Sequence, residues 1–142
     1  GYKWILTLDA DLQHPPDSIS LFLKTCTDNT VLVGNRRDLS SMPISRRFSN
    51  KLTSLLLSIR SNIPLRDSQC GFRLIPVQLF TEIKLFQNGF QFESEMLIKA
   101  AMFGYRVNHV EIPTLYGPEK SAMRNFRDTV KFAAMYCHSF LW

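Results

Sequence analysis

Short apolar stretches alternate along this chain with longer stretches whose apolar residues recur at helical spacing. We expect strands at residues 2–8, 30–34, 72–75 and 105–112. We expect helices at residues 16–27, 46–60, 76–84, 92–103 and 125–139. Strands that alternate with helices in this way predict an α/β layered domain.

The bulk composition fits one globular domain. The chain has 142 residues, 45% of them hydrophobic and 20% charged, and it has no internal repeat or Gly/Ser-rich linker. The formal net charge of +5 predicts affinity for an anionic partner, whether a nucleotide, a phospholipid surface or a nucleic acid. The three cysteines have no CxxC spacing, so we interpret them as free thiols in a reducing compartment.

Two acids stand directly after the first predicted strand, in the stretch DADLQHPP at residues 9–16. In an extended chain residues i and i+2 point to the same side, so Asp9 and Asp11 can converge on one point. Converging carboxylates repel each other unless a cation lies between them or they share a proton, and hard divalent cations prefer such oxygen ligands. The pattern predicts a metal site that binds a diphosphate, with a solvated turn and helix cap as the alternative. His14 fits a ligand, a surface residue or a residue that hydrogen-bonds to the backbone.

Further motifs follow the acidic stretch in order. They are GNRRD at 34–38, SRRFSN at 45–50, DSQCGFRLI at 67–75, a Gly/Phe-led helix and strand at 89–114, and YGPEKSAM at 116–123. Together with DADLQHPP, these segments resemble family 2 glycosyltransferases of the polyprenyl-phosphate branch, typified by dolichyl-phosphate mannose synthase. The resemblance covers almost the whole chain.

The resemblance implies a GT-A-like α/β/α sandwich and inverting transfer of a hexose from a UDP- or GDP-sugar to a polyprenyl phosphate. It also implies Mg²⁺ or Mn²⁺ as the cofactor, with Asp9, Asp11 and Gln13 around it. The family's opening strand and loop, which hold the nucleobase and ribose, have no counterpart here. Residues 1–142 are therefore expected to form a single catalytic domain that is incomplete at its N-terminus.

The acceptor decides whether such a reaction needs a general base. A sugar hydroxyl needs a carboxylate to take its proton. A lipid phosphate is already anionic and needs cations that hold it in line. Four arginines around one predicted loop and helix start are candidate phosphate-binding residues: Arg36, Arg37, Arg46 and Arg47. Two of them are interpreted as binding the phosphate, with a solvated basic surface as the alternative.

The D-x-x-x-GFR signature adds two candidate residues. We expect Asp67 near the sugar and Arg73 near the phosphates. In the structural alternative, Asp67 caps a turn and Gly71 permits a backbone angle that other residues avoid.

Two glutamates occur in the predicted helix at 92–103. Glu93 and Glu95 lie two residues apart, so they do not share a helix face. Glu95 matches the acid of the family's helix better, and Asp67 and Glu95 are the candidate bases if the acceptor is a hydroxyl. Lys120 and Ser121 are expected to close over the diphosphate, in an E-K-S order where close relatives have E-S-K.

The last predicted helix carries an apolar face formed by Phe126, Val130, Ala133, Ala134 and Cys137. This face either packs on its own domain or lies at a membrane surface beside anionic headgroups. No apolar run is long enough to cross a bilayer. We therefore expect a peripheral protein at the cytoplasmic face of a membrane.

Other functions compete with this interpretation. Haloacid-dehalogenase-type phosphatases also place two acids at a strand end, but they usually continue with small residues, where this chain has Leu12 and Gln13. A glycan hydroxyl acceptor and a non-catalytic remnant that binds metal and diphosphate remain as alternatives. A nucleic-acid partner is not expected, because the basic residues cluster beside an acidic motif and no nucleic-acid-binding signature occurs.

Overall fold

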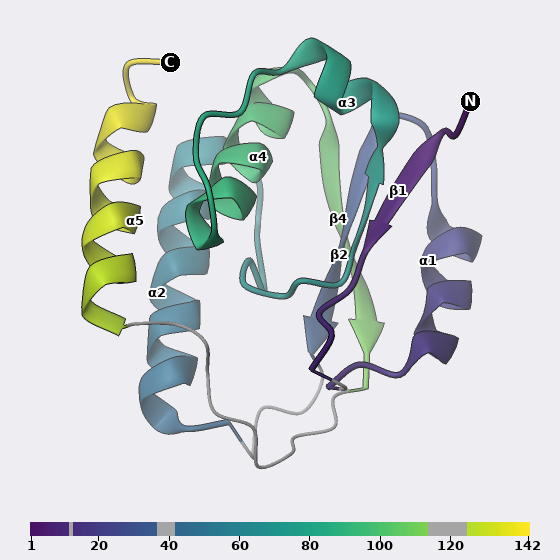
Figure 1. The fold of residues 1–142 in the computed structure, drawn as a ribbon, viewed down its shortest axis with the longest axis horizontal. Helices are drawn as coiled ribbons and strands as arrows, with labels where there is room; N and C mark the ends of the chain where they lie inside the picture. Colours follow the sequence, from purple (N-terminus) through teal and green to yellow (C-terminus); the bar gives the residue numbers. More distant parts are fainter. Residues whose placement is uncertain (12, 37–41, 114–124) are drawn as a thin grey trace.

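The computed structural model describes residues 1–11, 13–36, 42–113 and 125–142 (Figure 1). Its strands are β1 (Trp4–Thr7), β2 (Thr30–Arg36), β3 (Arg73–Pro76) and β4 (Arg106–Ile112). Its helices are the short 3-10 helix η1 (Pro16–Ser18), α1 (Ile19–Thr25), α2 (Ile44–Ser61), α3 (Val77–Glu82), α4 (Phe90–Met102) and α5 (Asn125–Ser139). The predicted α/β class is confirmed, and each predicted element is present with ends that differ by at most a few residues.

The strands of the described chain form one sheet in the order β1-β3-β2-β4. β3 runs antiparallel to both of its neighbours, whereas β2 and β4 are parallel. As a result, β1, β2 and β4 all end at the edge of the sheet where β3 begins, at the bottom of Figure 1. We call this edge the site edge, because the acidic turn after β1 and the arginine that ends β2 meet there.

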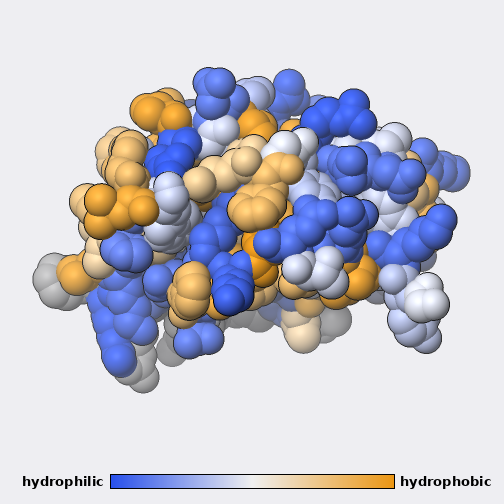
Figure 2. Space-filling model, turned by 90° about the horizontal axis from the view of Figure 1, so that it is seen from above, coloured by the Kyte–Doolittle hydropathy of each residue, from blue (hydrophilic) through white to orange (hydrophobic). Residues whose placement is uncertain are grey.

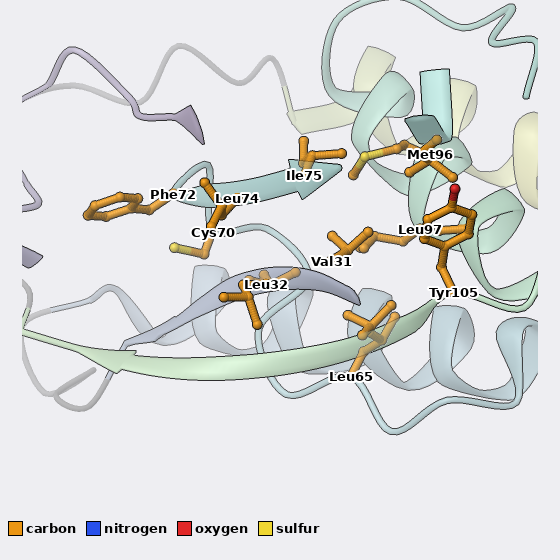
Figure 3. Packing of buried hydrophobic residues seen from close by; sticks show 14 of the residues in the cluster. Val31, Leu32, Leu65, Cys70, Phe72, Leu74, Ile75, Met96, Leu97 and Tyr105 are labelled. Carbon is orange, nitrogen blue, oxygen red and sulfur yellow. The ribbon is translucent and has the colours of Figure 1, made fainter. Parts of the chain in front are cut away.

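Helices cover both faces of the sheet. In Figure 1, α1 lies on one side, and α2, α4 and α5 lie on the other. On the first side Phe22 of α1 stacks on Phe72, with ring centroids 4.4 Å apart. Leu32 and Leu74 from neighbouring strands form one continuous hydrophobic cluster with Leu97 of α4 (Figure 3).

Helix α2 exposes a row of apolar residues at helical spacing. These residues, which we call the apolar stripe, are Ile44, Phe48, Leu52, Leu55 and Ile59, and they are between 45% and 81% exposed. The buried face of α2 instead carries Asn50, Ser54 and Leu57. The polarity of this helix is therefore the reverse of what is usual on a domain surface, where the apolar face packs inward.

Helix α5 packs through residues other than those predicted. The predicted face consists of Phe126, Val130, Ala133, Ala134 and Cys137. The last four are exposed, and the side chain of Phe126 lies outside the described part. Met135 and Ser139 are buried instead, and Arg60 of α2 donates to the hydroxyl and carbonyl of Ser139. Packing of the predicted face on the domain was therefore the wrong alternative. No helix of the described residues is long and apolar enough to cross a membrane.

The orientation of α2 can be tested with two leucines that are two residues apart. Leu57 is fully buried and Leu55 is 57% exposed. We expect Leu57→Ala to lower the free energy of unfolding by about 2–5 kcal/mol, because it leaves a cavity. Leu55→Ala should change it by about 0.5 kcal/mol or less. Urea unfolding followed by circular dichroism measures both, and equal losses would contradict this orientation.

Candidate functional site

The acidic turn after β1 lies against the loop that precedes β3. The Thr7 hydroxyl donates a 2.8 Å hydrogen bond to the Gly71 carbonyl. Both carboxylate oxygens of Asp9 lie 2.4 Å from the position that a Cβ on Gly71 would occupy. A larger residue at position 71 would therefore displace the Asp9 carboxylate. The predicted backbone-angle explanation is wrong, since the glycines with positive φ in the described chain are Gly89 and Gly104.

Asp11 and Gln13 form a tight turn next to Asp9. The Gln13 N–H donates a 3.1 Å hydrogen bond to Asp11 Oδ1, a local bond typical of aspartate in turns. The carboxylate and amide oxygens of the three side chains match the ligands that Mg²⁺ and Mn²⁺ prefer. No group of three or more His, Cys, Asp or Glu side chains that could enclose a metal occurs in the described part of the chain. A cation held by these side chains would need further oxygen ligands, such as those of a bound phosphate.

His14 is a buried residue, so the surface alternative is wrong, whereas a hydrogen bond to the Pro113 backbone agrees with the other alternative. It is 5% exposed, and its Nε2 lies 3.8 Å from Cys70 Sγ. Burial, with the Arg36 charge as the second cause, lowers the pKa of His14, so we expect a neutral ring at pH 7. Burial likewise raises the pKa of Cys70 to about 12. This contact of neutral groups joins the acidic turn to the loop before β3.

Asp67 and Arg36 form a buried ion pair at the site edge. Arg36 Nε and Nη2 donate to the two carboxylate oxygens of Asp67 at 2.6 and 2.8 Å. Asn50 Nδ2 of α2 donates a further 2.9 Å bond to Asp67 Oδ1. The two charged side chains are 11% and 3% exposed. The sequence nominated both residues for the site but did not predict that they bind each other.

Arg73, the first residue of β3, is 1% exposed and is held on several sides. Its guanidinium donates to the carbonyls of Cys70 at 2.9 Å and Ser68 at 2.8 Å, and its Nη2 contacts Glu93 Oε2 at 2.8 Å. Burial raises the pKa of Glu93, the Arg73 charge opposes this shift, and the Asp9 charge adds to it. Arg73 therefore brings Glu93 of α4 to the site edge, on the side of Asp9.

Glu95, the acid favoured from the sequence, points into the interior. It is fully buried and accepts hydrogen bonds from the N–H groups of Phe86 at 2.9 Å and Gln87 at 2.7 Å. Lys99 Nζ contacts its other oxygen at 2.7 Å. These bonds fasten the loop before α4, and the acid of this helix that reaches the site edge is Glu93. The two-residue spacing correctly indicated opposite faces, but it did not tell which face turns inward.

The remaining predicted phosphate-binding residues lie around the start of α2 or outside the described chain. Arg46 and Arg47 are partly buried in the first turn of α2, and Arg47 Nε donates to the Met42 carbonyl at 2.9 Å. Arg37, Lys120 and Ser121 lie outside the described residues. The binding roles of this whole group stay predictions.

Sequence comparison with known proteins identifies relatives of this chain. No family model matches the chain. An uncharacterised protein of Methanocaldococcus jannaschii is 31% identical over 125 residues, covering 83% of this chain and 54% of that protein. The undecaprenyl-phosphate mannosyltransferase of Micrococcus luteus is 26% identical over 123 residues, 82% of this chain and 50% of the enzyme.

A third relative, like the second, is named as a glycosyltransferase that uses a lipid phosphate. The UDP-N-acetylglucosamine–dolichyl-phosphate N-acetylglucosaminyltransferase of Methanococcus voltae is 26% identical over 144 residues, 96% of this chain and 57% of the enzyme. The resemblance to family 2 glycosyltransferases is confirmed. The mixed α/β fold of the chain agrees with the GT-A fold class of these relatives. The chain spans about half the length of the curated relatives it matches.

The proximity of Asp9 and Glu93 predicts a change in titration. Replacing Asp9 with Asn removes a negative charge that raises the pKa of Glu93, so the pKa of Glu93 should fall. Carboxyl ¹³C chemical shifts followed against pH measure this. Asp17→Asn is the matched control, because Asp17 is exposed at the start of η1 and is not among the charges that shift Glu93. An unchanged pKa in Asp9→Asn would contradict the placement.

Proposed function

We propose that this chain is the diphosphate- and acceptor-binding part of an inverting glycosyltransferase that transfers a hexose from a UDP- or GDP-sugar to a polyprenyl phosphate. The observation that carries the proposal is helix α2. It begins with two arginines near the site edge and then exposes a continuous apolar stripe. A lipid phosphate has the same two parts, an anionic head and an apolar tail. The lipid-phosphate acceptors in the names of two relatives support the same assignment.

The donor end of the site would be the acidic turn. Asp9, Asp11 and Gln13 would hold Mg²⁺ or Mn²⁺ together with the donor's phosphates. The cation would neutralise charge on the departing nucleotide diphosphate as a Lewis acid. The protein's own residues would place these ligands, since the Asp9 carboxylate occupies the space beside Gly71 and the Asp11 carboxylate accepts a hydrogen bond from the Gln13 N–H.

The surroundings of the predicted bases favour a phosphate acceptor over a hydroxyl. A general base needs a carboxylate that can accept a proton from the acceptor. Asp67 is already engaged by Arg36 and Asn50. Glu95 is fully buried among its own donors. A phosphate acceptor needs neither of them, because it is already anionic.

One observation favours the hydroxyl alternative. Glu93 is about one-third exposed at the site edge, and burial raises its pKa toward the range useful to a base. If a glycan hydroxyl is the acceptor, Glu93→Gln should lower kcat at least about a hundredfold, the lower range of a general-base contribution. With a phosphate acceptor, the same change should leave kcat within about tenfold of wild type, because no proton is transferred.

The exposed stripe suggests how the protein meets its lipid substrate. An apolar helix face flanked by cationic side chains binds anionic membrane surfaces, and Lys51 lies exposed beside the stripe on α2. Figure 2 shows further hydrophobic side chains gathered on the side where α5 and α2 lie in Figure 1. Among the exposed hydrophobic residues that follow α5 are Phe140 and Leu141. The free cysteines support a reducing compartment, so we place the protein at the cytoplasmic face of a membrane.

Membrane binding through α2 can be tested on its stripe. Phe48→Asp should weaken sedimentation with vesicles containing phosphatidylglycerol about tenfold or more, because a Phe buried in the interface contributes more than 1 kcal/mol. Leu23→Asp on α1 is the control, since Leu23 is also exposed but lies on the other side of the sheet. Equal losses from both variants would speak against a specific membrane-facing role of α2.

The donor site can be tested by titration calorimetry of UDP and GDP into the full-length protein, with and without Mn²⁺. We expect binding to require Mn²⁺ and to weaken about tenfold or more in Asp11→Ala, because a charged ligand is lost. Gly71→Ala should act similarly, because its Cβ displaces Asp9. Asp17→Ala serves as the control. Binding that ignores Mn²⁺ or survives both changes would refute the assignment of the acidic turn.

A further inference from the structure

The buried face of α2 is polar where it meets the loop before β3. Asn50 and Ser54, one helical turn apart, are each 3% exposed. Both point at the adjacent residues Asp67 and Ser68, which are each 2% exposed. A helix usually packs on its domain through apolar side chains. Here the apolar stripe of α2 faces outward, and Asn50 and Ser54 on its inner face form hydrogen bonds.

The contacts between α2 and this loop are paired. Asn50 Nδ2 donates to Asp67 Oδ1 at 2.9 Å. The Ser54 and Ser68 hydroxyls lie 2.9 Å apart, and the Ser68 backbone N–H donates to Ser54 Oγ at 3.0 Å. Ser54 Oγ also lies 3.4 Å from Asn50 Oδ1, so the two positions belong to one network. The network fixes both the carboxylate of Asp67 and the backbone of Ser68.

From this loop the contacts continue to both arginines at the site edge. Asp67 holds Arg36 through two hydrogen bonds. The Ser68 carbonyl accepts a 2.8 Å bond from Arg73 Nη2. The inner face of α2 therefore contacts the two residues that orient the guanidinium groups of Arg36 and Arg73. Among the contacts described, Asn50 and Ser54 reach these arginines only through Asp67 and Ser68.

We propose that Asn50 is a positioning residue that sets the orientation of Arg36, through Asp67, for the anionic group of the acceptor, and that Ser54 supports it through Asn50 and Ser68. This inference rests on the proposed function, since it deepens the acceptor side of the same site. It also gives α2 two tasks on two faces. The apolar stripe contacts the lipid, and the polar face orients, through Asp67, the arginine that binds the lipid's phosphate.

The hydrogen bonds of Asn50 and Ser54 serve orientation as well as stability. Replacing both partners of a buried hydrogen bond by apolar groups of similar shape is often nearly neutral for folding, but replacing only one leaves the other unpaired and is destabilising. Apolar residues at positions 50 and 54 would leave Asp67 and Ser68 with fewer partners. A carboxylate with fewer fixed donors constrains its arginine less.

The test uses the full-length protein and the variants Asn50→Leu and Ser54→Ala. Ser61→Ala is the matched control, because its hydroxyl bonds only within α2, to the Leu57 carbonyl, in the contacts described. We expect Asn50→Leu to raise the KM for polyprenyl phosphate about tenfold with the KM for the nucleotide-sugar unchanged. Ser54→Ala should raise it less, and Ser54→Thr, which keeps the hydroxyl, should restore the wild-type value.

A second readout needs no activity. In protein labelled with ¹⁵N-arginine, the Nε–Hε resonance of Arg36 should shift in Asn50→Leu and stay in place in Ser61→Ala. An unchanged resonance would overturn the proposal, as would a KM that rises equally for donor and acceptor. If the wild-type protein transfers no sugar, the proposed function fails, and the Arg36 resonance still decides whether α2 positions this arginine.

Discussion

A buried ion pair between Arg36 and Asp67 joins three parts of this molecule: the end of β2, the loop before β3 and helix α2. Removing two charges from water is costly, and close geometry with additional donors is needed to offset that cost. Two short bonds between the partners and a third from Asn50 provide it. The arginine that ends β2 is therefore held by the protein in one orientation, where a solvent-exposed side chain would sample many.

The same principle extends along the site edge. Arg73 is fixed by two backbone carbonyls and by Glu93, and Asp67 is fixed by Arg36 and Asn50. Charged groups of both signs are thus set in place before any ligand arrives. Preorganised charges of this kind stabilise a developing charge without having to rearrange at the moment of reaction.

Much of this arrangement could be predicted from the sequence, because it depends on backbone rules. Alternating strands and helices predicted the layers, and the predicted bounds of α5, residues 125–139, agree with those observed. The acids after β1 and the arginine at the end of β2 meet because parallel strands end at one edge. The sequence motifs were therefore enough to predict which strand ends carry the candidate site, although they did not predict its side-chain contacts.

The parts that could not be predicted depend on tertiary packing. Helical spacing showed that α2 has an apolar stripe, but spacing alone does not tell what covers a stripe, and here it faces outward. In α4 the spacing separated Glu93 from Glu95 and left open which one turns inward. His14 and Gly71 were misjudged for a similar reason, because the residues that surround them come from a loop more than fifty positions away.

The hydrogen bond between Thr7 and Gly71 has a consequence for folding kinetics. It closes a loop of 64 positions, and the pairing of β1 with β3 spans a similar separation. Contacts so distant in sequence form only after the entropy of a long flexible loop has been overcome, which slows folding relative to helical domains with local contacts. The helices can form early from local interactions, whereas Asp9 reaches its position beside Gly71 only after β1 has paired with β3. The acidic turn should thus be among the last parts of the nascent chain to acquire its final shape.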